Sequence, residues 1–291
     1  YLALCTANLP EPVIGPLGDS ISTENFNTVL WTGNSTNNTA ITGVGFQSDF
    51  VWIKQRSSVE WHRVHDTVRG VSQQLYSNAT NAEATTTNNL LSVNSDGFTL
   101  GTDSAVNGSG FTYVGWNWKA GGTASSNSDG SITSNVSANV DAGFSIVSWT
   151  GTGVNATVGH GLASAPELII AKNRDTNGTE WPVLETLVNG GTHYLRLDNI
   201  YASTNTSIIW NNTNPTDSVF SIGTYSYINE NTKDIIAYCF HSVDGYSKVG
   251  SYTGNGSADG TFVYTGFRPA FLMIKRTDSA NWWNMFDSVR E

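Results

Sequence analysis

The sequence contains little charge and no long apolar run. Charged residues make up 13% of its 291 residues, against about 25% in ordinary globular proteins. The formal net charge is −10, the isoelectric point is near 4.8, and lysines and arginines are not clustered. Nucleic acids and anionic membranes attract clustered positive charge, so we expect neither as a partner. No apolar run approaches the roughly 18 residues needed to cross a bilayer, so we expect no membrane insertion.

Cysteine is also scarce, which argues against a fold built on disulfides. Cys5 and Cys239 are the two cysteines, and two do not make a disulfide framework. Cys239 lies in the apolar run 235–240, which favours a buried free thiol. A bridge between Cys5 and Cys239, within one chain or between neighbouring chains, is the alternative.

The sequence repeats itself. A shift of 221 positions aligns Thr32-Gly33-Asn34 with Thr253-Gly254-Asn255 without a gap, and carries residues 31–69 onto 252–290. A weaker middle repeat is visible, in which Lys54 and Arg56 match Lys172 and Arg174. Repetition on this scale predicts an array of similar units.

The repeats predict five segments. These are an extended N-terminal tail (1–24), a first repeat (25–122), a linker (123–143), a second repeat (144–245) and a partial third repeat (246–291). The chain begins at Tyr1 and stops inside the third repeat, so we expect both ends to be edges of a fragment.

Helix signals are nearly absent, whereas strand signals recur in every repeat. No stretch keeps an i, i+3, i+4, i+7 apolar stripe, and threonine, asparagine and glycine are too frequent for stable helices. Segments 50–54, 168–172 and 271–275 have the pattern of buried central strands that end with a lysine at the rim. Segment 248–252 matches the opening strands at 26–31 and 144–149.

Aromatic residues alternate in the last strand of each full repeat. Alternation places Val114, Trp116 and Trp118 on one face in the first repeat, and Ile236, Tyr238 and Phe240 take their places in the second. One aromatic stripe that replaces another at the same pitch indicates packing in a core rather than a ligand platform.

These signals predict an all-β protein of tandem antiparallel β-sandwiches with a partial third module. About six to eight short strands in each repeat, separated by turns such as 94–97 and 127–130, are typical of two-sheet sandwiches. A lectin-like jelly roll is favoured over an immunoglobulin-like sandwich.

The one concentration of metal-type side chains contains Glu60, His62, His65 and Asp66. The third repeat has Trp283 and Phe286 in place of the two histidines. A metal site would therefore be private to the first repeat, and we expect a polar surface strand instead, with no metal and no cofactor.

An acidic residue and an arginine recur together. Asp66 and Arg69 match Asp287 and Arg290, a spacing that predicts a turn held by a hydrogen bond or an ion pair. No nucleophile, second carboxylate or phosphate-binding loop accompanies them in sequence. We therefore expect a protein that is not an enzyme, with no catalytic residues.

The chain carries ten Asn-x-Ser/Thr sequons, only slightly more than its composition gives by chance. Most fall in predicted loops, where a glycan could be attached on a secretory or surface route. They begin at Asn34, Asn37, Asn78, Asn107, Asn135, Asn155, Asn177, Asn205, Asn211 and Asn255.

A set of motifs lies along the chain: Gly45-Phe46, 50–54, 65–70, 95–101 and 113–122, with 4–10 at the start. As a set, these motifs resemble a family of unknown function found mainly in proteins of marine and freshwater phages and in some bacteria. The second repeat departs from them at Leu162-Ala163 and at Glu185-Thr186. The resemblance implies virion tail structures or extracellular fibres and no established catalytic residues.

The leading functional hypothesis is a structural subunit of a self-assembling filament, either a phage tail fibre or an extracellular fibril. A carbohydrate-binding adhesion module for cell-surface glycans is the alternative, and a depolymerising enzyme is least favoured. An incomplete third sandwich would expose sheet faces and strand edges, which the N-terminal tail of a neighbouring copy could complete by strand donation. The residues expected in that contact are Leu2, Leu4, Leu9, Val13, Ile14, Leu17, Phe271, Met273, Trp282 and Trp283.

Overall fold

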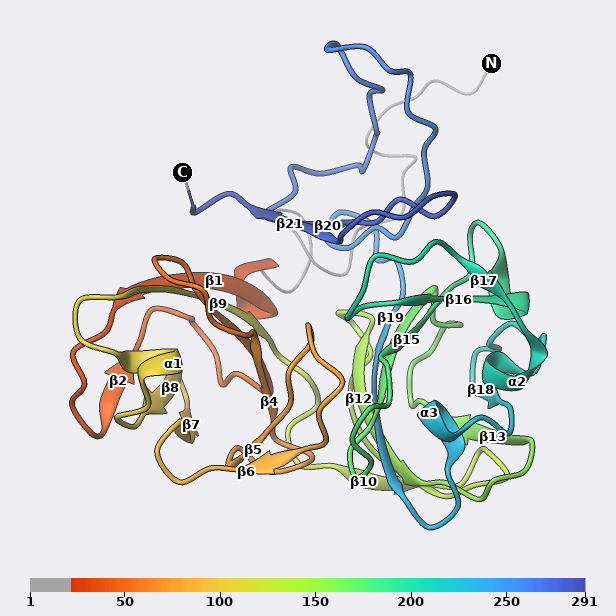
Figure 1. Ribbon diagram of the computed structural model, residues 1–291, viewed down its shortest axis with the longest axis horizontal. Coiled ribbons are helices and arrows are strands. Elements are labelled where there is room, and N and C mark those ends of the chain that lie inside the picture. Colours follow the sequence, from red (N-terminus) through yellow and green to blue (C-terminus); the bar gives the residue numbers. More distant parts are fainter. Residues whose placement is uncertain (1–21, 291) are drawn as a thin grey trace, which may run out of the picture.

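Antiparallel β-strands dominate residues 22–290, the part of the chain that the computed structural model describes (Figure 1). The first repeat contains β1 (Phe26–Thr32), β2 (Thr39–Ile41), β3 (Phe50–Gln55), β4 (Arg63–Asp66), β5 (Gln73–Gln74), β6 (Ala84–Thr85), β7 (Leu90–Asn94), β8 (Gly97–Leu100) and β9 (Thr112–Trp118). The all-β prediction is confirmed.

The later strands follow the same style. They are β10 (Ser125–Asn127), β11 (Ser134–Asn139), β12 (Phe144–Thr150), β13 (Ala156–Gly159), β14 (Leu168–Asn173), β15 (Pro182–Glu185), β16 (His193–Arg196), β17 (Thr204–Asn205), β18 (Val219–Ile222), β19 (Asp234–Phe240), β20 (Phe271–Ile274) and β21 (Asn284–Asp287).

Helices in residues 22–290 are single turns: η2 (Ser22–Glu24), α1 (Ser104–Asn107), η3 (Gly190–Thr192), α2 (Ser207–Trp210) and α3 (Ser226–Asn229). None of these helices is long and apolar enough to cross a membrane.

The first repeat folds as two facing sheets. One has the strand order β1-β9-β3-β4 and the other the order β2-β8-β7. Val51 and Ile53 from the first sheet pack with Phe98 and Leu100 from the second, and all four are buried. The turn predicted at 94–97 joins β7 to β8 as a hairpin, in which Asn94 pairs with Gly97. Alternation along each strand therefore builds a β-sandwich-like core.

The second repeat keeps the same central strand order. Strands β12-β19-β14-β15 lie inside an eight-stranded sheet, and β13 with β18 forms a small sheet. Ile169 and Ala171 from the large sheet pack with Phe220 and Ile222 from the small one. The lysine of this strand is not at the rim as predicted, because the Lys172 side chain is fully buried and donates to Thr179 O and Oγ1.

Residues 123–143, predicted to be a linker, instead contain β10 and β11. These strands extend the large sheet beyond β12, in register from Asn135–Ser148 to Asn139–Phe144. The Gly/Ser/Asn composition hid a strand in which Val136 and Ser137 are buried. Polar residues are accommodated there because the sheet ladder satisfies their backbone groups.

The third repeat contributes a two-stranded hairpin, β20–β21, that lies across the gap between the two larger parts (Figure 1). Residues 248–252, predicted to be its opening strand, form no strand. In the first repeat the opening strand β1 is hydrogen-bonded only to the closing strand β9. The described part of the third repeat holds no closing strand, so 248–252 has no ladder to join.

Candidate functional site

A cluster of apolar side chains fills the centre where the three repeats meet. It is formed by side chains on the sheet faces that point away from the separate cores of the first and second repeats. We call it the central cluster; it includes Phe50, Trp52, Trp116, Trp118, Phe144, Ile236 and Tyr238, with Phe240, Phe271, Met273 and Trp283 packed against it. Its contents come from all three repeats.

The predicted aromatic stripes lie in this cluster. Trp116 and Tyr238 are each 1% exposed, and Trp118 is also buried, so the prediction of a core stripe is confirmed. The core that they fill is the one between repeats. The Tyr238 ring lies 4.2 Å from the Phe50 ring, and the Trp118 ring lies 5.5 Å from the Phe271 ring, measured between centroids.

Asp66 and Arg69 form the predicted pinned turn. The Arg69 backbone N–H donates to Asp66 Oδ1 at 2.8 Å, and the Arg69 Nε–H donates to Asp66 Oδ2. The second repeat joins this pair, because the Tyr238 hydroxyl donates to Asp66 Oδ2 at 2.7 Å. The turn therefore holds a neighbouring repeat as well as its own loop.

The third repeat has the same arrangement. The Arg290 backbone N–H donates to Asp287 Oδ1 at 2.8 Å, and the Arg290 Nε–H donates to Asp287 Oδ2. Here the first repeat supplies the extra donor, since the Trp116 indole N–H lies 3.0 Å from Asp287 Oδ2. Trp116 and Tyr238 are the aromatic counterparts that the sequence aligned, so one contact occurs twice between different repeats.

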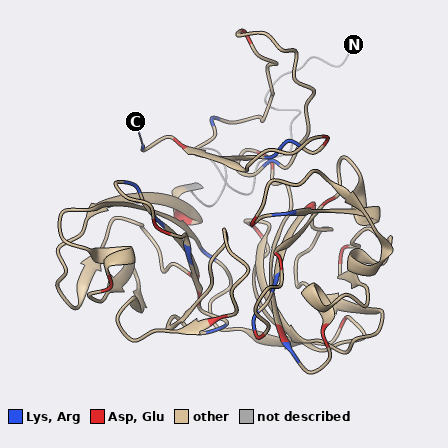
Figure 2. Cartoon of the chain, viewed as in Figure 1, with Lys and Arg blue, Asp and Glu red and all other residues tan. Residues whose placement is uncertain are grey.

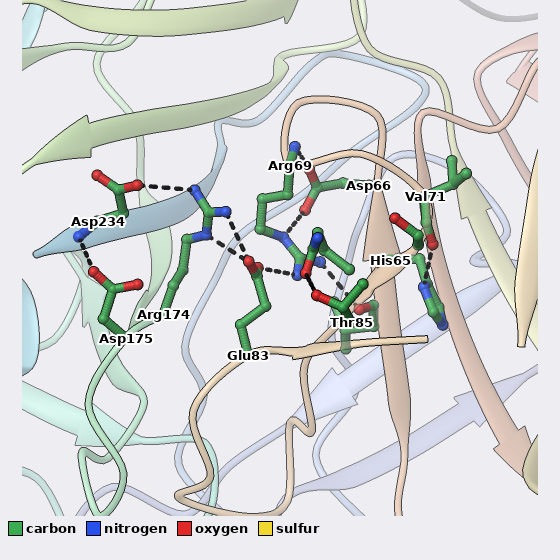
Figure 3. A network of polar contacts seen from close by, with 12 residues as sticks. His65, Asp66, Arg69, Val71, Glu83, Thr85, Arg174, Asp175 and Asp234 are labelled. Atoms are coloured by element: carbon green, nitrogen blue, oxygen red, sulfur yellow. Dashed lines mark hydrogen bonds and ion pairs between the residues drawn. The ribbon is translucent and has the colours of Figure 1, made fainter. Parts of the chain in front are cut away.

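A network of charges extends the Asp66 turn into the second repeat (Figure 3). Glu83 accepts from Arg69 Nη1 at 2.8 Å and from Arg174 Nη2 at 2.7 Å. Arg174 also lies near Asp234, at 3.9 Å. Glu83 therefore bridges an arginine of each repeat. Elsewhere the few charges of the described chain are scattered and of mixed sign (Figure 2).

Burial and neighbouring groups shift the pKa values of Arg69, Tyr238 and Asp287 at these contacts. Burial alone would lower the pKa of Arg69, but Asp66 and Glu83 outweigh it and raise that pKa above its ordinary value. Burial raises the pKa of Tyr238 well above its ordinary value. Burial would raise the pKa of Asp287, yet donors from Arg290 and Trp116 hold it below its usual range. These groups therefore keep the charge states that their contacts require near neutral pH.

Backbone acceptors repeat the same interface. The Trp181 indole N–H donates to Tyr76 O at 2.9 Å, and the Trp283 indole N–H donates to Arg196 O at 2.7 Å. Two backbone hydrogen bonds between the first and second repeats recur between the second and third. Gly178 N donates to Thr80 O, and its counterpart Asn281 N donates to Ile200 O. Likewise Glu83 N donates to Arg174 O, and Ser203 N donates to Thr277 O. The second repeat thus docks on the first as the third docks on the second.

Glu185 occupies the corresponding turn in the second repeat. It pairs with Leu168 across β14–β15, as Asp66 pairs with Phe50 across β3–β4. Its carboxylate accepts from Val188 N at 2.9 Å and Asn189 N at 3.2 Å, and Val188 stands in the place of Arg69. Burial raises the pKa of Glu185, because nearby backbone donors offset burial only partly.

The histidines serve the packing rather than a shared site. His62 Nδ1 accepts from the Trp52 indole at 2.8 Å, whereas His65 lies near Val71 O and Asn89 Oδ1. Burial lowers the pKa of His62 to about 3 and that of His65 to about 4. His65 is fully buried, so the expected polar surface strand is wrong at this position. Within residues 22–290 no group of three or more metal-type side chains could hold an ion.

Most sequon asparagines are exposed, but Asn107 is not. Its side chain is buried, and its amide donates to Thr36 O and Gly101 O. A glycan cannot be attached there in the folded chain, because the amide nitrogen is inside the first repeat. Asn107 is the last residue of the short helix α1, whose residues 105–107 are buried.

The remaining predicted residues divide between described and undescribed parts of the chain. Cys239 is a free, buried thiol whose pKa burial raises to about 12, and Cys5 lies outside the described residues. Phe271, Met273 and Trp283 pack against the central cluster, whereas Trp282 is 63% exposed. The tail positions Leu2, Leu4, Leu9, Val13, Ile14 and Leu17 also lie outside the described residues.

Sequence reasoning missed the contacts between repeats. Tyr76, Glu83, Arg174 and Arg196 carry them. The repeat alignment matched Arg174 with Arg56, but it assigned no contact to any of the four. One signal could have found part of them. Trp116 and Tyr238 occupy matching positions in the closing strands, and each carries an N–H or O–H donor that needs an acceptor when the ring is buried.

Comparison with known proteins identifies a family. Residues 21–291 match the model described as Domain of unknown function (DUF7483). No curated protein and no solved structure matches the chain. The family model spans the repeats, the interfaces between them and Glu185, and the chain therefore belongs to the DUF7483 family.

Proposed function

We propose that the chain is a non-enzymatic structural subunit of a filamentous assembly, joined head to tail through its third repeat. One observation carries this proposal: the face of β20–β21 that points away from the central cluster is apolar and exposed to solvent. Leu272 and Phe286 pair across this hairpin and are 41% and 54% exposed. Their counterparts in the first repeat, Val51 and His65, are 1% and 0% exposed.

An exposed face of this kind favours association. Large apolar patches on a soluble protein mark interaction sites. Further exposed apolar residues precede the hairpin, including Phe262 at 86% and Tyr264 at 79%. A contact between unlike surfaces of identical chains propagates instead of closing, which gives a linear or helical polymer. The partners are then copies of the chain itself, and strand donation by the N-terminal tail is one route to the contact.

The wider setting follows from the family resemblance. Repeated β modules in phage structural proteins and bacterial extracellular proteins favour a virion tail or an extracellular filament as the location. The exposed sequons are compatible with a surface route if the host glycosylates. We retain tandem lectin-like jelly rolls as the finer description of the sandwiches, since facing antiparallel sheets support a sandwich in each full repeat.

The alternative is a carbohydrate-binding adhesion module. Sugar stacking requires exposed aromatic rings that line a groove. Trp61 and Trp282 are exposed, at 47% and 63%, but most tryptophans are buried. Two hollows flank Gly121, one of about 680 Å³ beside Asp49 and Lys119, and neither is lined by an aromatic residue. The structural role is therefore better supported.

Electron microscopy of the purified chain tests this proposal. We expect filaments in the native protein and their loss in the double variant Leu272→Lys, Phe286→Lys, which places charge on the exposed face. Val59→Lys is the matched control, because Val59 is 98% exposed in the first repeat. A native chain that stays monomeric at every concentration would contradict the proposal, as would a double variant that still forms filaments.

A further inference from the structure

The contacts between repeats have a direction. The closing strand of the second repeat donates to Asp66 of the first through Tyr238. The closing strand of the first repeat donates to Asp287 of the third through Trp116. The indole hydrogen bonds have the same direction: Trp181 of the second repeat donates to the first repeat, and Trp283 of the third repeat donates to the second. Two successive steps of one rotation are therefore occupied.

The third step of the rotation would end at Glu185. This carboxylate stands at the position of Asp66 and Asp287, opposite Leu168 in the register of β14 and β15. The donor in this step would belong to a closing strand of the third repeat. Within residues 22–290 the third repeat has the strands β20 and β21, and no side chain of that repeat donates to Glu185.

The edge of β20 that faces away from β21 is the second feature of this region. In the first repeat β3 lies between the closing strand β9 and β4, and in the second repeat β14 lies between the closing strand β19 and β15. Their counterpart β20 is hydrogen-bonded only to β21 among the described strands, which leaves its other edge open. An open edge offers a row of backbone donors and acceptors to an added strand.

The chemistry of Glu185 differs from that of the occupied turns. Asp66 and Asp287 each have an arginine three residues later, whereas Glu185 has Val188. No guanidinium of this turn therefore reaches the carboxylate. The backbone N–H groups of Val188 and Asn189 each donate to one of its oxygens, and the remaining lone pairs can accept from a donor on an added strand. Burial already raises the pKa of Glu185, which fits a carboxyl that is partly removed from water.

We propose that the open edge of β20 and the carboxylate of Glu185 form one binding seat for a β-strand of the closing type. Such a strand runs antiparallel to β20 and carries aromatic residues at alternate positions, and its middle aromatic donates a hydroxyl or indole hydrogen to Glu185. The occupant is a closing strand of this repeat family. The N-terminal tail fits less well, because residues 1–17 contain a single aromatic residue, Tyr1.

A peptide-binding experiment tests the seat directly. The probe is a synthetic peptide with the sequence of residues 233–242, carrying Cys239→Ser for solubility, added to the full chain and followed by calorimetry. A second peptide also carries Tyr238→Phe, and a third has the sequence of residues 1–17. We expect the first peptide to bind and the phenylalanine peptide to bind about tenfold more weakly, since it loses a hydrogen bond to a charged acceptor.

Variants of the protein complete the cycle. In Glu185→Gln we expect the preference for the tyrosine peptide to shrink, because the charged acceptor is gone. Glu230→Gln is the control: Glu230 accepts from Asn173 and Thr176 in the same repeat, away from the seat. Equal preference in Glu185→Gln and in the native chain would overturn the assignment of Glu185.

Two further outcomes would overturn the seat. One is the absence of binding by the closing-strand peptide. The other is tighter binding by the 1–17 peptide with the same dependence on Glu185, which would make the tail the occupant. Both outcomes are independent of filament formation, which electron microscopy measures separately.

Discussion

Glu83→Gln should loosen the first repeat from the second without disrupting either core. Glu83 accepts three hydrogen bonds from two arginines: one from Arg69 at 2.8 Å, and two from Arg174 at 3.0 and 2.7 Å. The Glu83 side chain is 12% exposed and that of Arg69 is 0% exposed, so water replaces these bonds poorly. The substitution keeps the size of the side chain and removes its charge.

The magnitude follows from the buried partners. Breaking a buried ion pair by removing one partner costs about 3–5 kcal/mol, because the other charge stays uncompensated. Arg69 keeps its ion pair with Asp66, and the glutamine side chain keeps one of the two acceptor oxygens of the glutamate. We therefore expect a loss of about 2–4 kcal/mol in the free energy of unfolding, toward the lower part of that range.

Glu180→Gln is the matched control. Glu180 pairs with Arg196 at 2.6 Å inside the second repeat, and its side chain is 19% exposed. Both variants lose one carboxylate of a partly buried pair. Only Glu83→Gln removes a side-chain contact between the first and second repeats. Arg196 meets the third repeat through its backbone oxygen, which the Glu180 substitution leaves in place.

Urea unfolding followed by tryptophan fluorescence and by far-ultraviolet circular dichroism separates the two effects. In the native chain and in Glu180→Gln we expect the two signals to change together. In Glu83→Gln the two repeats should unfold in separate steps, because each keeps its own core. A single coincident transition in Glu83→Gln, with a loss below about 1 kcal/mol, would refute the view that this network joins the repeats.

Three further predictions concern single groups. Tyr238→Phe should lower the free energy of unfolding by about 1.5–3 kcal/mol in urea titrations, since Asp66 loses a buried donor. Acid should destabilise the chain: the pKa of His65 is about 4 in the folded state, so the unfolded state takes up its proton first. The free energy of unfolding should therefore fall by about 3 kcal/mol through His65 as the pH drops from 6.5 to 4. His65→Gln should flatten that part of the plot of unfolding free energy against pH. The Cys239 thiol should not react with a thiol reagent in the folded chain at pH 8, because burial raises its pKa to about 12, and reaction at the unfolded rate would contradict this.

Much of the fold was predictable because alternation in strands is a local signal. Segment 50–54 was predicted as a buried strand, and β3 is buried at four of its first five positions. The closing stripe of 114, 116 and 118 was assigned correctly to one buried face. Alternation does not reveal which other part of the protein packs on that face. It predicted that Trp116 is buried and not that a different repeat buries it.

The errors have the same origin. Residues 248–252 resemble an opening strand, but a strand exists only with a partner, and the partner is outside local sequence. Residues 134–139 read as linker because a ladder can satisfy polar residues as well as apolar ones. Glu83 and Arg174 are 91 positions apart in sequence, so no spacing rule joins them. The Asp66–Arg69 turn was predictable because its members are three positions apart.

The pairing of the first strand of each repeat with its last has a consequence for synthesis. Strand β1 finds its ladder only in β9, and β12 meets β19 more than 80 residues later in the chain. A nascent repeat cannot close its main sheet until its last strand has left the ribosome, because loop closure must precede these long-range contacts. Each finished repeat then offers a formed surface to the next one, so the chain should acquire its structure in steps of one repeat. A ribosome paused within the first repeat would hold β1 unpaired and prone to aggregation, whereas a pause just after β9 would not. In the second repeat β12 already has β11 on one edge, so a pause there would expose a single edge.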